Sequence, residues 1–223
     1  AGIPHERRVR YLSEVADLLA VRRWDFNVPP RTGVMKGQKL RDALDRMLES
    51  RTFADLLIPL LIVATDLGTG AEVVIDSGPL ADAVRASLGI PGAFDPWRIG
   101  DRLLIDGAVV NPLPASVLRD RGLSVVIASM VAGKRDDPSA PPLQSAPPIM
   151  QTMLRMVNLM ERELIKAQLP LIDLLIHPQV ATNYSFDFTN IDPFIAEGER
   201  AATEALAAVA PASLGSRGPV RLS

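Results

Sequence analysis

Short apolar runs that alternate with amphipathic segments constrain the fold of this chain most. The runs are too short for helices and have the composition of buried strands. They are LLIVATD (60–66), AEVVID (71–76), RLLI (102–105), SVVIAS (124–129) and DLLIHP (173–178). Apolar residues recur at helical spacing between these runs and at both ends of the chain. These segments cover 5–20, 38–49, 79–88, 113–121, 148–168 and 192–209. The alternation predicts one α/β domain over 1–209 on a mainly parallel sheet, followed by a flexible tail over 210–223.

Composition excludes several kinds of site. The chain has 223 residues, no cysteine, a net charge of −2 and two histidines, His5 and His177. Disulfides, thiolate ligands and a cysteine nucleophile are therefore ruled out, and so is a histidine-rich metal site. No basic stripe favours a nucleic-acid partner. We expect neither a metal nor a cofactor. The most apolar stretch, around Leu56–Ala64, contains Pro59 and is too short to span a bilayer.

Asp66 ends the first apolar run and precedes LGTG (67–70). An aspartate in this position commonly accepts a hydrogen bond from the main chain of the following turn. A dinucleotide-binding fingerprint needs G-x-G-x-x-G between a strand and a helix, whereas here G-x-G leads into an expected strand. We therefore predict a structural role for Asp66 and no nucleotide site.

Asp106 ends the run RLLI and precedes Gly107 and Ala108. Asp-Gly is a common turn dipeptide, so a turn is the simplest interpretation. The preceding buried strand places the carboxylate at a sheet edge, where α/β proteins gather their chemistry. Asn111, followed by Pro112, is predicted to cap the next helix, so Asp106 is not needed for that task. The residues alone leave a turn and catalysis both open.

Other residues have weaker support as catalytic candidates. Ser87 lies at a predicted helix end in RASLGIPG, without a G-x-S-x-G elbow around it, and no such elbow occurs in the chain. His177 precedes Pro178 near a strand end, which is more often a structural position. A self-contained Ser-His-Asp triad is therefore not supported. The Met/Leu stripe of 148–168 is predicted to pack in a core, with a lipid-facing surface as the alternative.

Several segments, taken in order, resemble the patatin-like phospholipase family, in particular its bacterial branch related to neuropathy target esterase. The order is ATDL with a turn, then ASLGIPG, then DGA followed by NPLP. The matching segments are FADLLIPLLIVATDLGTG (53–70), GPLADAVRASLGIPGAF (78–94), RLLIDGAVVNPLPASVLRDRG (102–122), VVIAS (125–129), DLLIHP (173–178) and FIAEGERAATEAL (194–206). The resemblance implies a three-layer α/β fold.

The resemblance also implies an activity. Family members are serine acyl hydrolases with a Ser-Asp dyad, and the D-G-A motif of that dyad falls on Asp106, Gly107 and Ala108. A general base activates the weakly nucleophilic serine hydroxyl, and Asp106 would take that role. The family's nucleophilic serine lies upstream in a G-x-S-x-G elbow, so the chain matches a C-terminal portion whose N-terminal part is missing. We expect this chain alone to be inactive. The alternative is an inactive relative that binds lipid or acts as a scaffold.

The expected substrate is a phospholipid or lysophospholipid. We expect no nucleic-acid partner, and we expect a location in the cytoplasm, with peripheral contact to the cytoplasmic face of the membrane as an option. The oligomeric state stays open.

Overall fold

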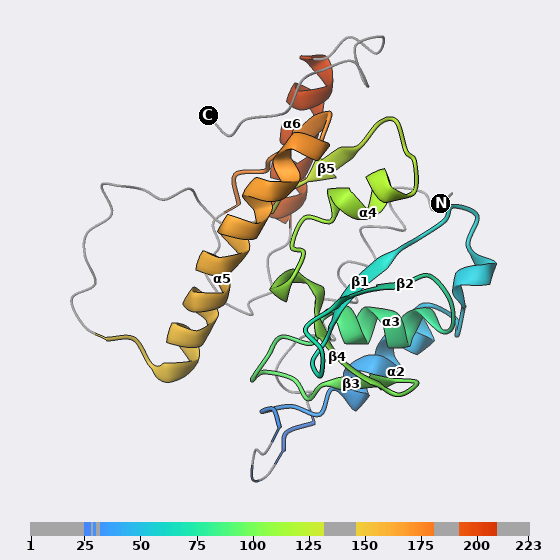
Figure 1. The fold of residues 1–223 in the computed structure, drawn as a ribbon, viewed down its shortest axis with the longest axis vertical. Coiled ribbons are helices and arrows are strands. Elements are labelled where there is room, and N and C mark those ends of the chain that lie inside the picture. Colours follow the sequence, from blue (N-terminus) through green and yellow to red (C-terminus); the bar gives the residue numbers. More distant parts are fainter. Residues whose placement is uncertain (1–24, 28, 30–31, 132–145, 181–191, 209–223) are drawn as a thin grey trace. The chain divides into compact units, whose positions relative to one another are not determined.

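The computed structural model describes residues 25–27, 29, 32–131, 146–180 and 192–208. They divide into two compact units. Figure 1 shows their helices and strands, coloured along the sequence. The described residues up to Asn111 belong to the first unit, and those from Pro112 onward belong to the second. The predicted helix over 5–20 and the predicted tail over 210–223 lie outside the described residues.

The first unit is built on a four-stranded sheet with the order β2-β1-β4-β3. Its strands are β1 (Ile62–Asp66), β2 (Glu72–Ile75), β3 (Trp97–Ile99) and β4 (Arg102–Asp106). The apolar runs at 60–66, 71–76 and 102–105 are thus confirmed as strands. β3 was not predicted, because three residues are too few for a recognisable pattern.

The predicted mainly parallel sheet is not confirmed, since every pairing in this sheet is antiparallel. Short connections explain two of the three pairings. Five residues join β1 to β2, and Gly100 and Asp101 alone join β3 to β4. Parallel neighbours need a crossover of about a dozen residues or more, so these short turns enforce hairpins. An apolar run looks alike in either kind of sheet, which is why the run composition misled the prediction.

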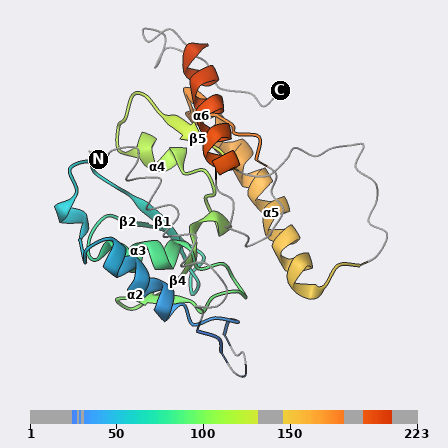
Figure 2. The same cartoon turned by 180° about the vertical axis from the view of Figure 1, so that it is seen from behind.

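Two helices accompany the sheet, α2 (Gln38–Met47) and α3 (Leu80–Ser87), as the sequence predicts. α3 packs on β1, β3 and β4, and α2 packs on α3 (Figure 2). Pro79 occupies the N-cap position of α3, and no side chain caps this helix. The cores comprise Ala64, Ile75, Ala83, Ala86 and Leu104 between sheet and α3, and Met35, Leu40, Leu44, Ala81, Ala93 and Phe94 between the helices.

Arg85 of α3 is fully buried and binds the chain segments around it. Its guanidinium donates to the carbonyl oxygens of Lys36 and Asp95, each at 2.8 Å, and of Gly37 at 3.2 Å. It also stacks between the rings of Phe94 and Trp97 at 4.9 and 5.0 Å. Burial lowers the pKa of Arg85 to about 10, which still leaves it charged at neutral pH.

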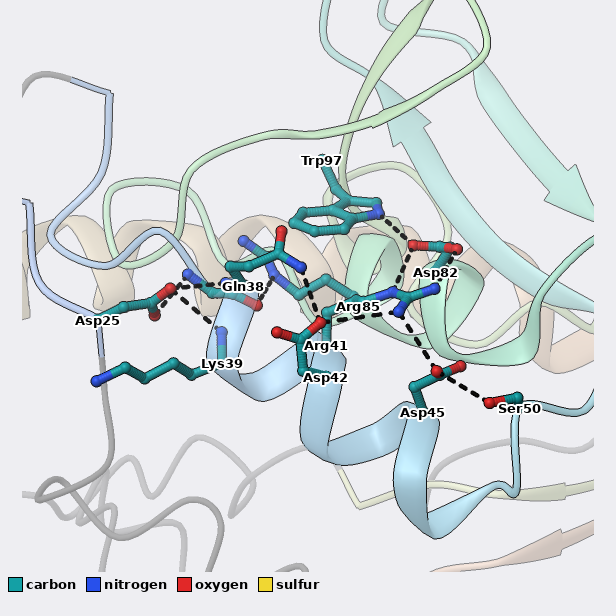
Figure 3. A network of polar contacts seen from close by, with 11 residues as sticks. Asp25, Gln38, Lys39, Arg41, Asp42, Asp45, Ser50, Asp82, Arg85 and Trp97 are labelled. Atoms are coloured by element: carbon teal, nitrogen blue, oxygen red, sulfur yellow. Dashed lines mark hydrogen bonds and ion pairs between the residues drawn. The ribbon is translucent and has the colours of Figure 1, made fainter.

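Figure 3 shows the polar contacts around the start of α2 and beside Arg85. The carboxylate of Asp25 accepts hydrogen bonds from the main-chain amides of Gly37, Gln38 and Lys39, so it satisfies the first amides of α2 from 12 residues upstream. Asp82 of α3 accepts from the guanidinium of Arg41 on α2 and from the indole of Trp97. These bonds join α2, α3 and β3.

Over its described residues, the second unit contains a parallel pair of strands and three helices. The elements are α4 (Ala115–Asp120), β5 (Ile127–Ser129), α5 (Ile149–Gln168), the 3₁₀ turn η4 (Leu169–Leu171), β6 (Leu174–Ile176) and α6 (Asp192–Ala207). All were predicted except η4, and Gly122 follows α4 with a φ of 80°, as expected for a helix end. Arg119 donates to the buried Asp173 at 2.7 Å, and Asp173 also accepts from the amide of Val126.

The Met/Leu stripe of α5 is only partly a core surface. Ile165 near its C-terminal end is 3% exposed and belongs to the core of the second unit. Met153, Met156, Leu159 and Met160 are 40–59% exposed. The predicted core packing is thus wrong for these four side chains, and the lipid-facing alternative stays a prediction. No helix within the described residues is long and apolar enough to cross a membrane.

Candidate functional site

Asp106 is the last residue of β4, and its main chain is held by bonds from two sides. It pairs with Ala64 of β1, and its amide donates to the carbonyl oxygen of Gly89 at 3.1 Å. Its own carbonyl oxygen accepts from the hydroxyl of Thr65, a residue that is 2% exposed, at 2.8 Å. These main-chain bonds therefore fix the direction in which the Asp106 side chain leaves the strand.

The Asp106 carboxylate caps the turn that follows it. Its Oδ1 accepts a hydrogen bond of 2.9 Å from the amide of Ala108, at the start of the one-turn 3₁₀ helix η3 (Gly107–Val109). Within the described part of the chain, Oδ2 of Asp106 has no hydrogen-bond partner. The turn interpretation and the catalytic interpretation therefore do not exclude each other, since one oxygen holds the turn while the other is left to accept a proton.

Burial raises the pKa of the Asp106 carboxyl above its ordinary value, because desolvation disfavours the charged form. The hydrogen bond from the amide of Ala108 acts in the opposite direction and is the smaller effect. A raised pKa makes the carboxylate a stronger base than a solvated aspartate. The electrostatics of the site thus favour proton acceptance.

Gly107 lies too close to β1 for any side chain. A Cβ on Gly107 would lie 2.7 Å from the carbonyl carbon of Val63, closer still to its oxygen, and 3.2 Å from the amide nitrogen of Ala64. These are main-chain atoms of a paired strand, so they cannot move aside cheaply. The glycine of the D-G-A motif is required by this close approach, and the approach places η3 directly beside β1.

Asn111 was predicted to cap the helix after it, and that prediction is wrong. α4 begins at Ala115 with Pro114 as its N-cap residue. Asn111 is instead 7% exposed, and its side-chain amide donates to Oε2 of Glu72 on β2 at 2.6 Å. The sequence did not indicate this contact, because no local pattern relates positions 39 residues apart.

Among the described residues of the first unit, neither Asp66 nor Ser87 is hydrogen-bonded to the Asp106 side chain. Asp66 has the predicted structural role, since its Oδ1 accepts from the amide of Gly68 at 2.9 Å. Ser87 is the last residue of α3, and no hydrogen bond among the described residues joins it to Asp106. His177 belongs to the second unit, and His5 lies outside the described residues.

No group of histidine, cysteine or carboxylate residues in the described ranges is arranged to hold a metal ion. The described residues at this strand end offer a half-buried carboxylate, held beside a glycine turn.

Comparison with known proteins places this site in a family context. The family model described as patatin-like phospholipase matches residues 1–119, a range that includes the Asp106–Gly107–Ala108 motif. An uncharacterised NTE family protein of Mycobacterium tuberculosis is 35% identical over 107 residues, which is 48% of this chain and 30% of that protein.

Two further relatives are similar over comparable lengths. A second uncharacterised NTE family protein of Mycobacterium tuberculosis is 29% identical over 165 residues, 66% of this chain and 28% of that protein. Patatin-like phospholipase domain-containing protein 7 of Rattus norvegicus is 34% identical over 110 residues, 48% of this chain and 8% of that protein. The chain therefore matches less than a third of the length of each of these relatives.

Proposed function

The chain belongs to the patatin-like phospholipase family, and from this premise we propose that it forms part of a serine-dependent lipid acyl hydrolase in which Asp106 is the general base. Membership of this family points to lipid hydrolysis as the general activity. The observation that carries the residue assignment is the Asp106 carboxylate itself. One of its oxygens binds the turn of η3, the other has no partner among the described residues, and burial raises its pKa.

The proposed reaction proceeds in two half-reactions. Oδ2 of Asp106 takes the proton of a serine hydroxyl while the serine oxygen attacks the ester carbonyl, and the alcohol leaves with that proton. Water then attacks the acyl-enzyme, with Asp106 again accepting a proton, and the fatty acid is released as the serine regains its hydrogen. The proposal places the serine and the donors that stabilise the oxyanion outside residues 1–223, because no G-x-S-x-G motif occurs within them.

The rigidity of the site supports this role. A carboxylate is a weak base in water, with a pKa near 3.9, so it needs both desolvation and fixed placement to act on a serine. The bonds from Thr65 and Gly89 hold the main chain of Asp106, and the bond from Ala108 holds one carboxylate oxygen. Little reorganisation remains to be done when the proton moves.

The proposed substrates are phospholipids or lysophospholipids, met by peripheral contact with a membrane surface on its cytoplasmic side. The proposal keeps the three-layer α/β fold that the family resemblance implies.

A fluorophosphonate probe tests the proposal, since such probes label activated serines. We expect the intact protein to be labelled at a serine outside residues 1–223, and we expect Asp106→Asn to slow that labelling strongly. The 223-residue chain by itself should not be labelled. Failure of the intact protein to react would favour an inactive lipid-binding relative, and labelling of the isolated chain at Ser87 would contradict the assignment.

A further inference from the structure

The geometry points to a second contribution to this site: we propose that Asn111 and Glu72 position the Asp106 carboxylate by holding the turn of η3 against the sheet. The inference rests on the proposed function. Neither residue touches the reacting atoms in this scheme, so both are positioning residues and not catalytic ones.

Asn111 binds the turn on one side and the sheet on the other. Its main-chain amide donates to the carbonyl oxygen of Gly107 at 2.9 Å, which closes the turn that begins at Asp106. Its side chain reaches Oε2 of Glu72 at 2.6 Å. The residue that ends the turn is thereby bonded to β2, two strands away from β4 in the sheet order.

The strand register shows that this bond completes a closed circuit. Glu72 pairs with Thr65 of β1, and Thr65 pairs with Ile105 of β4. The hydroxyl of Thr65 donates to the carbonyl oxygen of Asp106. The path from Asp106 through η3, Asn111 and Glu72 returns across β1 to Asp106, so the turn is fixed at both of its ends.

The bond between Asn111 and Glu72 is of a strong kind. Its acceptor is a carboxylate, its length is short, and its donor comes from a residue that is 7% exposed. The Glu72 residue as a whole is exposed and lies on an edge strand of this sheet. Removal of the Glu72 carboxylate should therefore disturb the turn far more than the core.

Loss of this bond has a specific chemical consequence. If η3 moves away from the sheet, the amide of Ala108 no longer stays on Oδ1 of Asp106. The carboxylate then gains rotational freedom. The hydrogen bond from Ala108, which lowers the pKa of Asp106, is weakened, so this pKa rises further. A residue that served stability alone would not shift the pH at which the base becomes active.

The experiment compares Glu72→Ala, Glu72→Gln and Asp101→Ala in the intact protein with a water-soluble nitrophenyl ester. Glu72→Gln keeps an acceptor oxygen, and Asp101→Ala removes an exposed carboxylate from the β3–β4 turn of the same sheet. For Glu72→Ala we expect about a tenfold or larger fall in kcat, KM within about twofold, and an acid limb of the kcat/KM profile that moves to higher pH. The kcat of Glu72→Gln should stay within about threefold of the wild-type value. The kcat of Asp101→Ala should equal that of the wild type.

Hydrogen–deuterium exchange of the same variants tests the positioning without reference to catalysis. The peptide covering residues 104–111 should exchange faster in Glu72→Ala than in the wild type and remain unchanged in Asp101→Ala. Unchanged exchange, an unchanged acid limb, or equal losses in Glu72→Ala and Asp101→Ala would each overturn the inference. If Asp106→Asn keeps wild-type activity, the proposed function fails, while the exchange measurement still decides whether Glu72 holds the turn.

Discussion

Gly107→Ala should be among the most damaging single-methyl additions in the first unit. The new Cβ would lie 2.7 Å from the carbonyl carbon of Val63, and ordinary van der Waals contact begins near 3.4 Å. The end of β4 must then move from β1 by about 0.7 Å or more, the difference between these two distances. That movement strains the pairing of Asp106 with Ala64 and the bond from the Thr65 hydroxyl.

The expected cost follows from these contacts. Overpacking by one methyl group costs about 1–3 kcal/mol, and each weakened hydrogen bond adds about 1 kcal/mol. We therefore expect Gly107→Ala to lower the free energy of unfolding by about 3 kcal/mol, a large part of the roughly 5–15 kcal/mol that stabilises a typical domain. A urea unfolding curve, followed by tryptophan fluorescence, measures this change because Trp97 packs within the first unit.

Gly198→Ala is the matched control, because the same methyl group is added where nothing lies within 4 Å. Gly198 is inside α6, where alanine is favoured over glycine by about 1 kcal/mol. This variant should be as stable as the wild type or more so. A Gly107→Ala protein within about 0.5 kcal/mol of the wild type would refute the close packing of η3 against β1.

Two further predictions concern buried charge. Arg85→Met should lower the free energy of unfolding by about 3 kcal/mol or more, because the carbonyl oxygens of Lys36, Gly37 and Asp95 lose their donor. Thermal unfolding measures this change. A loss below about 1 kcal/mol would contradict the role of Arg85 as the donor that satisfies these carbonyl groups. Asp106→Asn should raise the melting temperature at pH 7. The folded-state pKa of Asp106 lies above the ordinary value of 3.8, so the contribution of this one group to the stability of the wild type is fully present below that pH and is lost as pH rises through the folded pKa. The advantage of Asn should therefore vanish as the pH falls below about 3.8, and a constant difference across this range would count against a raised pKa.

Sequence patterns located the elements better than they located the pairings. The runs around β1 and β4 were recognisable because apolar residues bounded by turn residues mark strands. The antiparallel pairings of β1 with β2 and of β3 with β4 follow from short connections, whereas the composition of a run does not indicate its direction, and β3 has only three residues. The periodicity of α5 correctly predicts an apolar Met/Leu face. It does not indicate whether other parts of the chain bury that face.

The candidate site, too, was predicted only in part from the sequence. Asp106 and Gly107 were found because a strand end, an Asp-Gly turn and a family resemblance all coincide at one place. The contact between Asn111 and Glu72 depends on how two distant segments fold together, so no local pattern could indicate it. The mistaken cap assignment for Asn111 has the same origin, since Asn-Pro before a helical segment is a capping pattern that the actual chain path does not use.

The most direct test of the central claim is the turnover of a soluble ester by the intact protein and its Asp106→Asn variant. Asn keeps the shape of the side chain and an oxygen that accepts from the amide of Ala108, but it cannot take a proton. We predict that kcat falls by about a thousandfold while the variant folds at least as stably as the wild type at pH 7. Turnover within a few fold of the wild type would contradict Asp106 as the general base.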